Sequence, residues 1–262
     1  MRVHPAERVI ARTPATLGAM TTFSEPSARA WRLGEREVHV WRVDLAAGGQ
    51  PLEGLLSTEE LARAHRFHRP DDRRRYVAAH GALRRLLGRY VGAEPDRLRF
   101  CSSAGGKPRL VFEAGQPPLR FNLSHSAELA LVGVACDREI GVDVERIRPE
   151  LATGEIAGRF FAPGEAATLC TLPKEAQAEA FFACWTRKEA YVKARGDGIT
   201  RGLDHFEVTL APGEVPAIRS ASDDPEAATR WSIVSLTPAP GYLAAVVVEG
   251  RDLDLHCWRW PD

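Results

Sequence analysis

The stretch that decides the fold reads Ile-Gly-Val-Asp-Val-Glu at residues 140–145. Apolar and polar residues alternate in it, which predicts a strand with the isoleucine and both valines on one face. Asp143 and Glu145 then share the other face, where neighbouring carboxylates repel each other unless a cation lies between them. Oxygen ligands of this kind favour Mg²⁺, which in turn usually carries substrate phosphates. The stretch therefore predicts a strand with a magnesium site; a solvated sheet face is the alternative.

A second stretch, Trp-Thr-Arg-Lys-Glu-Ala-Tyr-Val-Lys at residues 185–193, lies in a pattern that predicts a helix. Large apolar residues make one stripe along this helix, and Glu189 lies beside the stripe, one turn after Trp185. Lys193 follows one turn later. An exposed Glu–Lys pair at this spacing is worth only about a few tenths of a kcal/mol. Together with the two carboxylates of the strand, Glu189 is better interpreted as a third metal ligand and Lys193 as a cation that faces a phosphate.

The composition is that of a globular protein. The 262 residues are 44% hydrophobic and 27% charged, and the formal net charge is zero, which argues against a general nucleic-acid binder. The longest uninterrupted apolar stretch, residues 129–135, is far shorter than the roughly 20 residues that span a bilayer. Five scattered cysteines without close pairs indicate reduced thiols and a cytoplasmic location. Only four of the 35 Lys and Arg residues are lysines, and the segments of interest contain three of them: Lys107, Lys188 and Lys193.

The order of predicted elements repeats after about 100 residues. A strand, helices and further short strands are expected twice, first in 38–45, 57–90, 97–101, 109–113, 121–126 and 129–135, and again in 140–147, 152–195, 206–210, 233–236 and 242–248. This duplication predicts an α+β fold of two similar halves, each with a small antiparallel sheet and packed helices, related by a pseudo-twofold axis. We expect a loose N-terminal tail over 1–35, an N-terminal half over 36–137 and a C-terminal half over 138–262, with a ligand cleft between the halves.

With these segments the chain resembles the 4′-phosphopantetheinyl transferases, specifically their long Sfp-type form, which consists of two similar halves. That family has a strand of the form Ile/Val-Gly-Ile/Val-Asp-x-Glu and, further along, a helix with Trp-x-x-Lys-Glu-Ala/Ser-x-x-Lys. Residues 140–145 and 185–193 carry these two patterns here. Gly-Lys-Pro at 106–108 and Phe-Asn-Leu-Ser-His-Ser at 121–126 match two further segments of the family, in the same order. The resemblance covers the region from about 55 to 200.

The resemblance implies a role for each matched residue. Asp143, Glu145 and Glu189 would hold Mg²⁺ against the pyrophosphate of coenzyme A, and Lys193 would stabilise the departing 3′,5′-ADP as a cation or a proton donor. The remaining coenzyme A contacts would come from the matched segments and from the basic helix in the first half: Arg63, Arg84, Lys107, Pro108, Ser124, His125, Lys188 and Lys193.

The resemblance assigns the individual nucleotide contacts less directly than the metal ligands. Most arginines of the basic helix are expected on a solvated face, and the family often has lysine where this chain has Glu60, Arg63 or Tyr76. A lone histidine such as His125 is more often structural, yet its polar neighbours in 121–126 favour a phosphate contact. These departures concern the 3′-phosphate above all.

Glu165 is the candidate general base, because it matches a family glutamate after an Arg-Phe-Phe segment, here residues 159–161. A serine that attacks phosphorus must lose its proton, and a glutamate accepts it directly or through a water. The alternative is a first-turn helix residue after Pro163, favoured there by the helix dipole.

The implied activity is transfer of the 4′-phosphopantetheine moiety of coenzyme A to a serine hydroxyl of an apo acyl or peptidyl carrier protein. The carrier is expected to be a small acidic helical domain that docks near residues 151–171 of a monomeric enzyme, with no nucleic-acid or membrane partner. A metal-dependent nuclease or phosphohydrolase on the same carboxylates is the enzymatic alternative, but it leaves the Gly-Lys-Pro and Ser-His segments unexplained. A nucleic-acid-binding module fits less well, since no aromatic residues interleave the arginines. The pathway that the carriers serve stays open.

Overall fold

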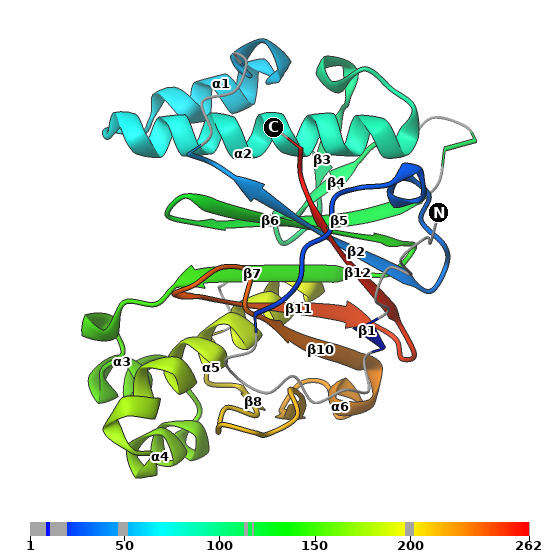
Figure 1. The fold of residues 1–262 in the computed structure, drawn as a ribbon. Coiled ribbons are helices and arrows are strands. Elements are labelled where there is room, and N and C mark those ends of the chain that lie inside the picture. The colour runs from blue at the N-terminus through cyan, green and yellow to red at the C-terminus, as the bar shows by residue number, and fades with distance from the viewer. Residues whose placement is uncertain are drawn as a thin grey trace, which may run out of the picture.

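The computed structural model of the chain describes residues 9–10, 20–46, 52–112, 115–116, 118–196 and 202–261. Two sheets lie face to face in the middle of the molecule, and helices cover the outer side of each (Figure 1). One sheet and its helices belong mainly to the first half of the chain, the other mainly to the second half. This is the α+β architecture of two halves that the sequence predicts.

The first half follows the predicted order of elements. Its bounds are η1 Ala28–Trp31, β2 Glu37–Asp44, η2 Glu53–Leu55, α1 Thr58–His65, α2 Pro70–Val91, η3 Pro95–Arg97, β3 Phe100–Ser102, β4 Pro108–Leu110, β5 Leu119–Ser126 and β6 Leu129–Cys136. Helix α1 begins with a capping box. Ser57 Oγ accepts from the Glu60 amide at 3.2 Å, and Glu60 Oε2 accepts from the Ser57 amide at 2.8 Å.

The second half contains the predicted strand and helices and three elements that the sequence analysis does not anticipate: β9, α6 and β12. Its bounds are β7 Ile140–Arg146, η4 Pro149–Leu151, α3 Gly154–Phe160, α4 Pro163–Thr171, α5 Lys174–Arg195, β8 Phe206–Val208, β9 Ile218–Ala221, α6 Ala227–Arg230, β10 Trp231–Leu236, β11 Tyr242–Glu249 and β12 Asp254–Arg259. Both long helices, α2 and α5, end at a glycine with positive φ, Gly92 and Gly196.

The strand order confirms the predicted duplication. In the first half β2 pairs antiparallel with β6, and β6 with β5. In the second half β7 pairs antiparallel with β11, and β11 with β10. The small hairpin β3–β4 corresponds to β8–β9, because each follows the long helix of its half. The same chain path is therefore used twice, and β5 and β7 are the edge strands that meet where the halves join.

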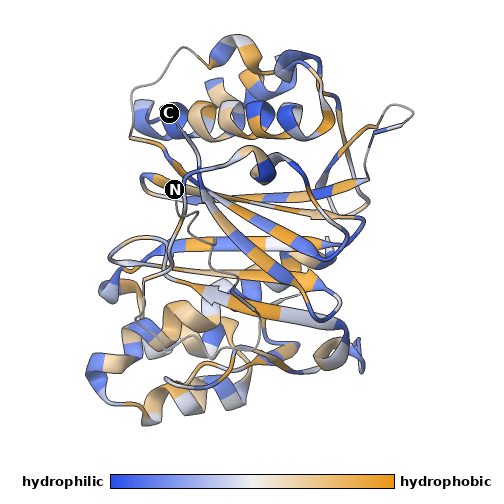
Figure 2. Ribbon diagram, turned by 45° about the vertical axis from the view of Figure 1, so that its right-hand side comes forward, coloured by the Kyte–Doolittle hydropathy of each residue, from blue (hydrophilic) through white to orange (hydrophobic). Residues whose placement is uncertain are grey.

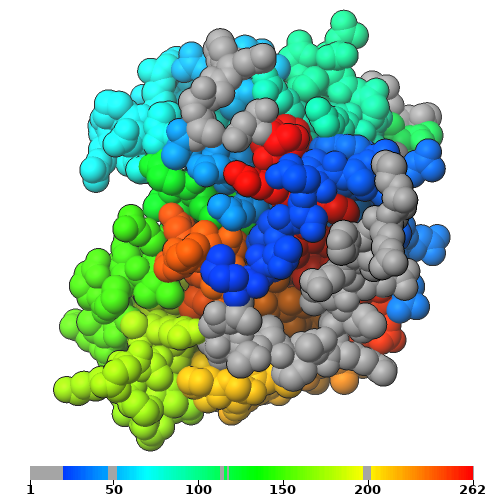
Figure 3. All heavy atoms as spheres, viewed as in Figure 1, coloured from blue at the N-terminus to red at the C-terminus, as the bar shows by residue number. Residues whose placement is uncertain are grey.

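The two ends of the chain depart from the predicted boundaries. Strand β12 pairs in parallel with β2, so residues 254–259 complete the sheet of the first half and not of the second. Strand β1, Val9–Ile10, pairs with β12. Part of the segment expected as a loose tail over 1–35 is attached to the rest of the protein: the Thr21 amide donates to the Thr237 carbonyl at 3.0 Å, and Ala30 is buried. In Figure 3 the described residues from Met20 onward (blue) lie beside the C-terminal segment (red).

Hydrophobic residues form three layers. Leu86 of α2 and Trp41 of β2 belong to the layer between helix and sheet in the first half, and Phe181 of α5 belongs to its counterpart in the second half. The third layer lies between the sheets and includes Val40 and Val142. Figure 2 shows hydrophobic residues alternating with hydrophilic ones along the strands in the centre of the molecule. Within the described ranges, no helix combines the length and apolar character that crossing a membrane requires.

Gly141 lets β7 pack directly on α5. A Cβ atom at this position would overlap the Ala190 carbonyl oxygen and the Ala194 amide nitrogen of the helix, so that only glycine fits. The contact brings the strand that bears Asp143 against the helix that bears Lys193. The glycine of the first sequence stretch thus has a direct structural reason.

Candidate functional site

The carboxylate of Asp143 lies at the junction of β7, β5 and α5. Its side chain is 4% exposed, and its Oδ1 accepts hydrogen bonds from Lys193 Nζ at 2.6 Å and from Ser124 Oγ at 2.9 Å. The other oxygen, Oδ2, is buried and has no hydrogen-bond partner. A buried carboxylate oxygen without a partner is costly unless a further donor or a cation reaches it. Asp143 therefore has one oxygen that fits a cation.

Two further carboxylates surround Asp143. Glu145 Oε2 accepts from Ser126 Oγ at 2.7 Å, and Arg148 lies 3.8 Å from the same carboxylate. Burial raises the pKa of Glu145 and the neighbouring charge of Asp143 adds to the rise. Burial likewise raises the pKa of Glu189; Asp143 and Glu145 add to that rise, while Lys193 opposes it. The three carboxylates lie close enough to repel one another, as the sequence predicts.

This arrangement suits a divalent cation by its chemistry but is not closed around one. Among the residues that the structure describes, no group of three Asp, Glu, His or Cys side chains has the geometry of a metal site. Lys193 instead neutralises Asp143. The unpartnered Oδ2 and the mutual repulsion of the carboxylates are nevertheless what a hard cation relieves. The residues fit the group, while the structure leaves the metal role of Asp143, Glu145 and Glu189 a prediction.

Polar side chains of β5 join the two sheets at this site. Asn122 Oδ1 accepts from the Val142 amide at 2.9 Å, and Ser124 Oγ from the Val144 amide at 3.4 Å. Ser126 Oγ accepts from the Arg146 amide at 3.1 Å. These side chains satisfy the edge of β7 that faces β5, where the described strands form no backbone ladder. The polar residues beside His125 therefore have a structural task, which weakens the sequence argument that they mark a phosphate contact.

A cavity of about 690 Å³ opens in the first half, between α1, α2 and the strands β3 to β5. Several of the predicted coenzyme A contacts line it, together with aromatic and basic residues that the sequence analysis did not assign. The charged and aromatic lining consists of Glu59, Glu60, Arg63, Phe67, Tyr76, His80, Arg84, Arg99, Phe100, Phe121 and His125, and Pro108 also faces it. The cavity is therefore basic and aromatic, which suits a phosphorylated purine nucleotide.

Aromatic rings form one wall of this cavity. His80 stacks on Tyr76 with ring centroids 3.8 Å apart, and Phe67 lies 5.3 Å from Tyr76. The guanidinium of Arg63 lies over the Tyr76 ring, 5.9 Å from its centroid. Burial lowers the pKa of His80 to about 4, so this ring is neutral at neutral pH. The aromatic wall was not predicted; Tyr76 and His80 lie one turn apart on α2, and the fold places Phe67, from the connection between α1 and α2, against them.

His125 links the cavity to the carboxylates. Its side chain lines the cavity, while the preceding residue of β5, Ser124, bonds Asp143 on the other side of the strand. Burial lowers the pKa of His125, and the positive charges of Lys193 and Arg75 lower it further. The structure thus brings together Asp143, Glu145, Glu189, Lys193, Ser124 and, across β5, the cavity residues His125, Pro108 and Arg63.

Three predicted contacts are buried in ion pairs and do not reach a ligand. Lys188 is fully buried, and its Nζ donates to Glu165 at 2.7 Å and to the Leu203 and Phe206 carbonyls. These acceptors use its three hydrogens, so none is left for coenzyme A, for which Lys188 was a predicted contact. Arg84 touches the cavity wall, but its guanidinium is bound to Glu60 at 2.7 Å and to two carbonyl oxygens.

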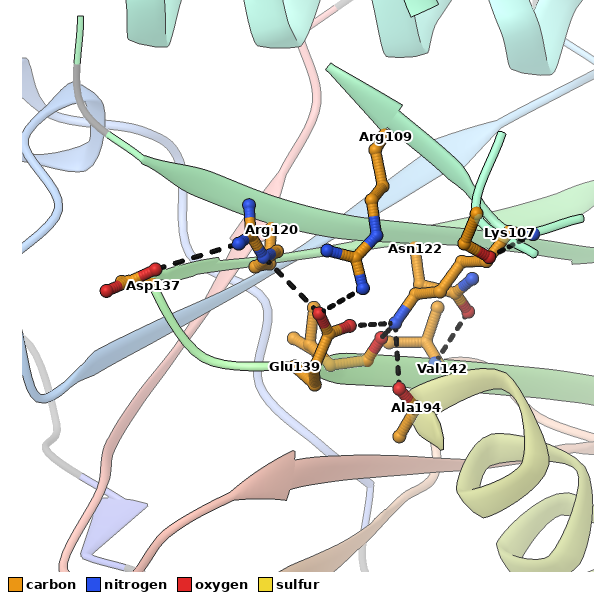
Figure 4. A network of polar contacts seen from close by, with 10 residues as sticks. Lys107, Arg109, Arg120, Asn122, Asp137, Glu139, Val142 and Ala194 are labelled. Carbon is orange, nitrogen blue, oxygen red and sulfur yellow. Dashed lines mark hydrogen bonds and ion pairs between the residues drawn. The ribbon is translucent and has the colours of Figure 1, made fainter. Parts of the chain in front are cut away.

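Lys107 is also held inside the protein. It is 7% exposed, and its Nζ donates to Glu139 at 2.7 Å and to the Ile140 and Ala194 carbonyls at 2.9 Å each (Figure 4). All three ammonium hydrogens are occupied within the fold. The Lys107 side chain is thus not available to nucleotide phosphates, contrary to the expectation from the Gly-Lys-Pro segment.

Glu165, the candidate base, is a helix-capping residue in this structure. One of its oxygens accepts from the Val208 amide at 2.7 Å, and the other accepts from the Ala162 amide at 2.8 Å and from Lys188. Burial raises the pKa of Glu165, and Lys188 opposes the rise. A side chain that is 3% exposed and engaged at both oxygens has no route to a substrate hydroxyl. The alternative interpretation, a first-turn helix residue, describes its contacts.

A second cavity, of about 450 Å³, lies at the C-terminal end of α2. Arg85, Arg89 and Trp260 line it, and it contains none of the residues predicted to act in the site. The larger cavity beside β5 is accordingly the one that the site residues define.

Comparison with known proteins agrees with this geometry in both halves. A family model described as the 4′-phosphopantetheinyl transferase superfamily matches residues 139–247, and one described as 4′-phosphopantetheinyl transferase, N-terminal, matches residues 51–137. The 4′-phosphopantetheinyl transferase HetI of Nostoc sp. is 41% identical over 227 residues, which cover 86% of this chain and 92% of the relative. The 4′-phosphopantetheinyl transferase psf-1 of Bacillus pumilus is 34% identical over 72% of this chain and 78% of its own length. Sfp of Bacillus subtilis, a 4′-phosphopantetheinyl transferase, is 29% identical over 76% of this chain and 84% of its own length. The chain therefore belongs to the 4′-phosphopantetheinyl transferase superfamily and is an enzyme of that class.

Proposed function

We propose that this enzyme transfers the 4′-phosphopantetheine of coenzyme A to a serine of an apo acyl or peptidyl carrier domain, with Mg²⁺ bound and 3′,5′-ADP released. The observation that carries the proposal is the buried, unpartnered Oδ2 of Asp143, one strand away from a basic and aromatic cavity of about 690 Å³. The cavity accommodates a nucleotide, and the carboxylates accommodate a cation beside its pyrophosphate. The two sites together match the two parts of the substrate.

The chemistry requires one bond to form and one to break. The serine oxygen bonds to the phosphorus that carries the pantetheine, and the bond from that phosphorus to the bridging oxygen breaks, so that 3′,5′-ADP leaves with the electron pair. When bound to Asp143, Glu145 and Glu189, Mg²⁺ would neutralise charge that develops on the pyrophosphate. Lys193, whose side chain is 29% exposed, supplies a second positive charge at the same place and can donate a proton to the leaving group.

The proton of the attacking serine needs an acceptor. The contacts of Glu165 do not support this role, because both its oxygens accept hydrogen bonds from buried groups. Glu189 is only partly buried and faces the same junction as Lys193 and Asp143, so its carboxylate is the more accessible acceptor. We therefore assign proton acceptance to Glu189, directly or through a water.

The nucleotide is proposed to lie in the first-half cavity. Arg63 and His125 supply charge and hydrogen-bond donors for phosphate oxygens, and Arg99 is a further cation on the lining. The rings of Tyr76, Phe67 and the neutral His80 supply a stacking wall for adenine. Recognition of the nucleotide by the first half and of the pyrophosphate by the second half follows from this arrangement.

The proposal extends to the carrier and to the state of the enzyme. Because one chain supplies both the cavity and the carboxylates, a monomer suffices, and the carrier is expected near residues 151–171 beside the carboxylates. A cytoplasmic location is proposed as well, since the five cysteines form no disulfide.

Intact-mass spectrometry of an apo carrier domain, incubated with this protein, coenzyme A and Mg²⁺, tests the proposal. A mass gain of one phosphopantetheine arm, with 3′,5′-ADP released and both lost in a chelator, is the expected result. No gain across fatty-acid, polyketide and peptidyl carriers would overturn the transfer reaction. Hydrolysis of the pyrophosphate without a carrier would instead favour a phosphohydrolase.

A further inference from the structure

Lys107 lies in the tight turn between β3 and β4, and that turn directs its side chain into the junction of the two halves. The Ser103 amide donates to the Lys107 carbonyl at 2.9 Å, and the Lys107 amide donates to Ser103 Oγ at 3.1 Å. Gly106 has a φ of +83°, which makes the reversal possible. The aliphatic stem of Lys107 runs beside Gly196, the C-cap of α5, where a Cβ would lie 3.2 Å from Lys107 Cδ. The turn thus packs one half of the molecule against the other.

The ammonium of Lys107 bonds the two elements that carry the site. Its Nζ donates to the carbonyl of Ile140, the first residue of β7, and to the carbonyl of Ala194 in the last turn of α5 (Figure 4). Carbonyls of a last helical turn have no partner within the helix, and a cation there is favoured by the helix dipole. One ammonium therefore fixes the start of β7 and the end of α5 relative to each other.

Glu139 holds that ammonium in place. Its two oxygens accept from Lys107 at 2.7 Å and from Arg109 at 2.6 Å, and Arg120 lies 3.3 Å away (Figure 4). Burial raises the pKa of Glu139, but the three cations outweigh burial and the net pKa is lowered. The carboxylate thus remains ionised, and it stands next to Ile140 in the chain.

The contacts of Lys107 end close to the reacting groups. Asp143 follows Ile140 by three residues on β7, and Lys193 directly precedes Ala194 on α5. The 2.6 Å pair between Asp143 and Lys193 depends on how these two elements are set against each other. A shift of either end would change that separation, and displacements of about 1 Å can cost on the order of 10²-fold in rate.

We propose that Lys107 and Glu139 are positioning residues, which set the spacing of β7 and α5 and so place the carboxylates and Lys193, and that Lys107 makes no contact with coenzyme A phosphates. The proposal rests on the proposed transferase function. It differs from the nucleotide-binding role that the Gly-Lys-Pro segment implies, because a positioning residue affects the rate of transfer while a phosphate contact affects coenzyme A binding.

Two substitutions in the full-length chain separate these roles. Lys107→Met removes the ammonium and keeps an unbranched side chain, and Glu139→Gln removes its counter-charge while Lys107 stays. We expect each to lower kcat by about tenfold or more with the KM for coenzyme A nearly unchanged. Coenzyme A binding measured by calorimetry should stay near the wild-type value. Hydrogen exchange should increase in the last turn of α5 and at the start of β7, and not in α2.

Arg120→Gln is the matched control, because it removes an outer cation from Glu139 without touching the backbone of β7 or α5. It should leave kcat and the exchange pattern near wild type. Lys107→Arg keeps the charge and should recover part of the rate. Because Glu139→Gln retains Lys107, it keeps the test valid if Lys107→Met does not fold.

A different pattern would overturn the proposal. If Lys107 contacted a phosphate, Lys107→Met would weaken coenzyme A binding by about tenfold or more, with exchange in α5 and β7 unchanged. Unchanged kcat and unchanged exchange in both variants would remove Lys107 and Glu139 from any positioning role. The exchange measurements need no transfer reaction, so failure of the wild-type protein to modify a carrier would sink the proposed function and leave this test standing.

Discussion

The two halves of the molecule each contain one buried ion pair at the same place in the repeat. Arg84 of α2 pairs with Glu60, and Lys188 of α5 pairs with Glu165, both at 2.7 Å. In each half the glutamate also accepts from the backbone amide three residues earlier, at 2.8 Å, and so caps a short helix. Each cation therefore ties the start of one helix to the middle of the long helix.

The rest of the surroundings repeats too. Arg84 donates to two carbonyl oxygens of the segment after α2, and Lys188 to two after α5. Arg84 lies 5.0 Å from the ring centroid of Phe100, and Lys188 lies 4.3 Å from that of Phe206. The duplication has thus preserved a complete set of contacts, although the cation has changed from guanidinium to ammonium.

What differs is the space around the pair. Glu60 and Arg84 border the 690 Å³ cavity, and the Glu60 side chain is 16% exposed. Glu165 and Lys188 are 3% and 0% exposed, beside the large apolar cluster that contains Phe161 and Phe181. One half keeps its interior open for a ligand, and the other fills it and carries the charged residues on β7 and α5. The comparison teaches that a repeated framework can divide binding and chemistry between its copies.

The largest effect on transfer is expected from a substitution in the second half, at Asp143. Asp143→Asn keeps the shape of the side chain but removes the charge at the buried Oδ2, and transfer to a carrier should fall by about 10³-fold or more. Urea denaturation should show a stability close to that of the wild type. Asp71→Asn, an exposed aspartate at the start of α2, is the control. Normal transfer by Asp143→Asn would remove this residue from the site.

Breaking the two ion pairs tests the difference in burial directly. Lys188→Met leaves Glu165 without its cation in a sealed interior and should cost about 3–5 kcal/mol of unfolding free energy. Arg84→Met should cost about 2–3 kcal/mol, because Glu60 can draw on water in the cavity. Urea denaturation of both variants gives the comparison. An equal or larger loss for Arg84→Met would contradict the assignment of the open cavity to the first half.

The cavity itself is tested by Arg63→Gln. Arg63 is exposed along the lining, so its loss should weaken coenzyme A binding by about tenfold while stability is unchanged. Binding of 3′-dephospho-coenzyme A should change much less if Arg63 faces the 3′-phosphate. Arg66→Gln, an exposed arginine outside the lining, serves as control. Equal losses for both ligands would place Arg63 elsewhere on the nucleotide.

The smallest expected effect is a change in the pH dependence of stability on substitution of Glu189. Burial raises the folded-state pKa of Glu189, so ionisation of this side chain lowers stability as pH rises through that pKa. Without divalent cations, Glu189→Gln should therefore be more stable than the wild type at pH 7, by about 1 kcal/mol or less, and the advantage should vanish in acid. Added Mg²⁺ should stabilise only the wild type. If Glu189→Gln were less stable than the wild type at pH 7, burial and the neighbouring carboxylates would not destabilise ionised Glu189.

Much of this architecture could be predicted from local patterns. The alternation at 140–145 predicts β7, and the apolar stripe before Lys193 predicts α5, because both elements bury one face along their whole length. The repeated order of elements then predicts two halves. Asp143 and Lys193 could be placed together because the motif and the helix each present one polar position to the same junction.

Other features depend on contacts that no local pattern records. Lys107, Lys188 and Arg84 were expected at a ligand, since a cation beside a motif suggests phosphate, yet each donates to backbone carbonyls outside its own helix or turn. Glu165 follows Ala162, which lacks a capping side chain, so nothing in the sequence distinguishes a capping glutamate from a base. Strand β12 was missed because its partner, β2, lies more than 200 residues earlier in the chain.

The crossing of β12 into the first half also constrains how the protein is made. During synthesis, residues 37–136 leave the ribosome long before Asp254–Arg259, and until then β2 lacks its parallel neighbour. The first half therefore completes its sheet only after residues 254–259 have been synthesised. Loss of residues 254–259 would leave Asp143 and Glu145 on a complete second sheet, beside a first-half cavity whose sheet lacks one strand.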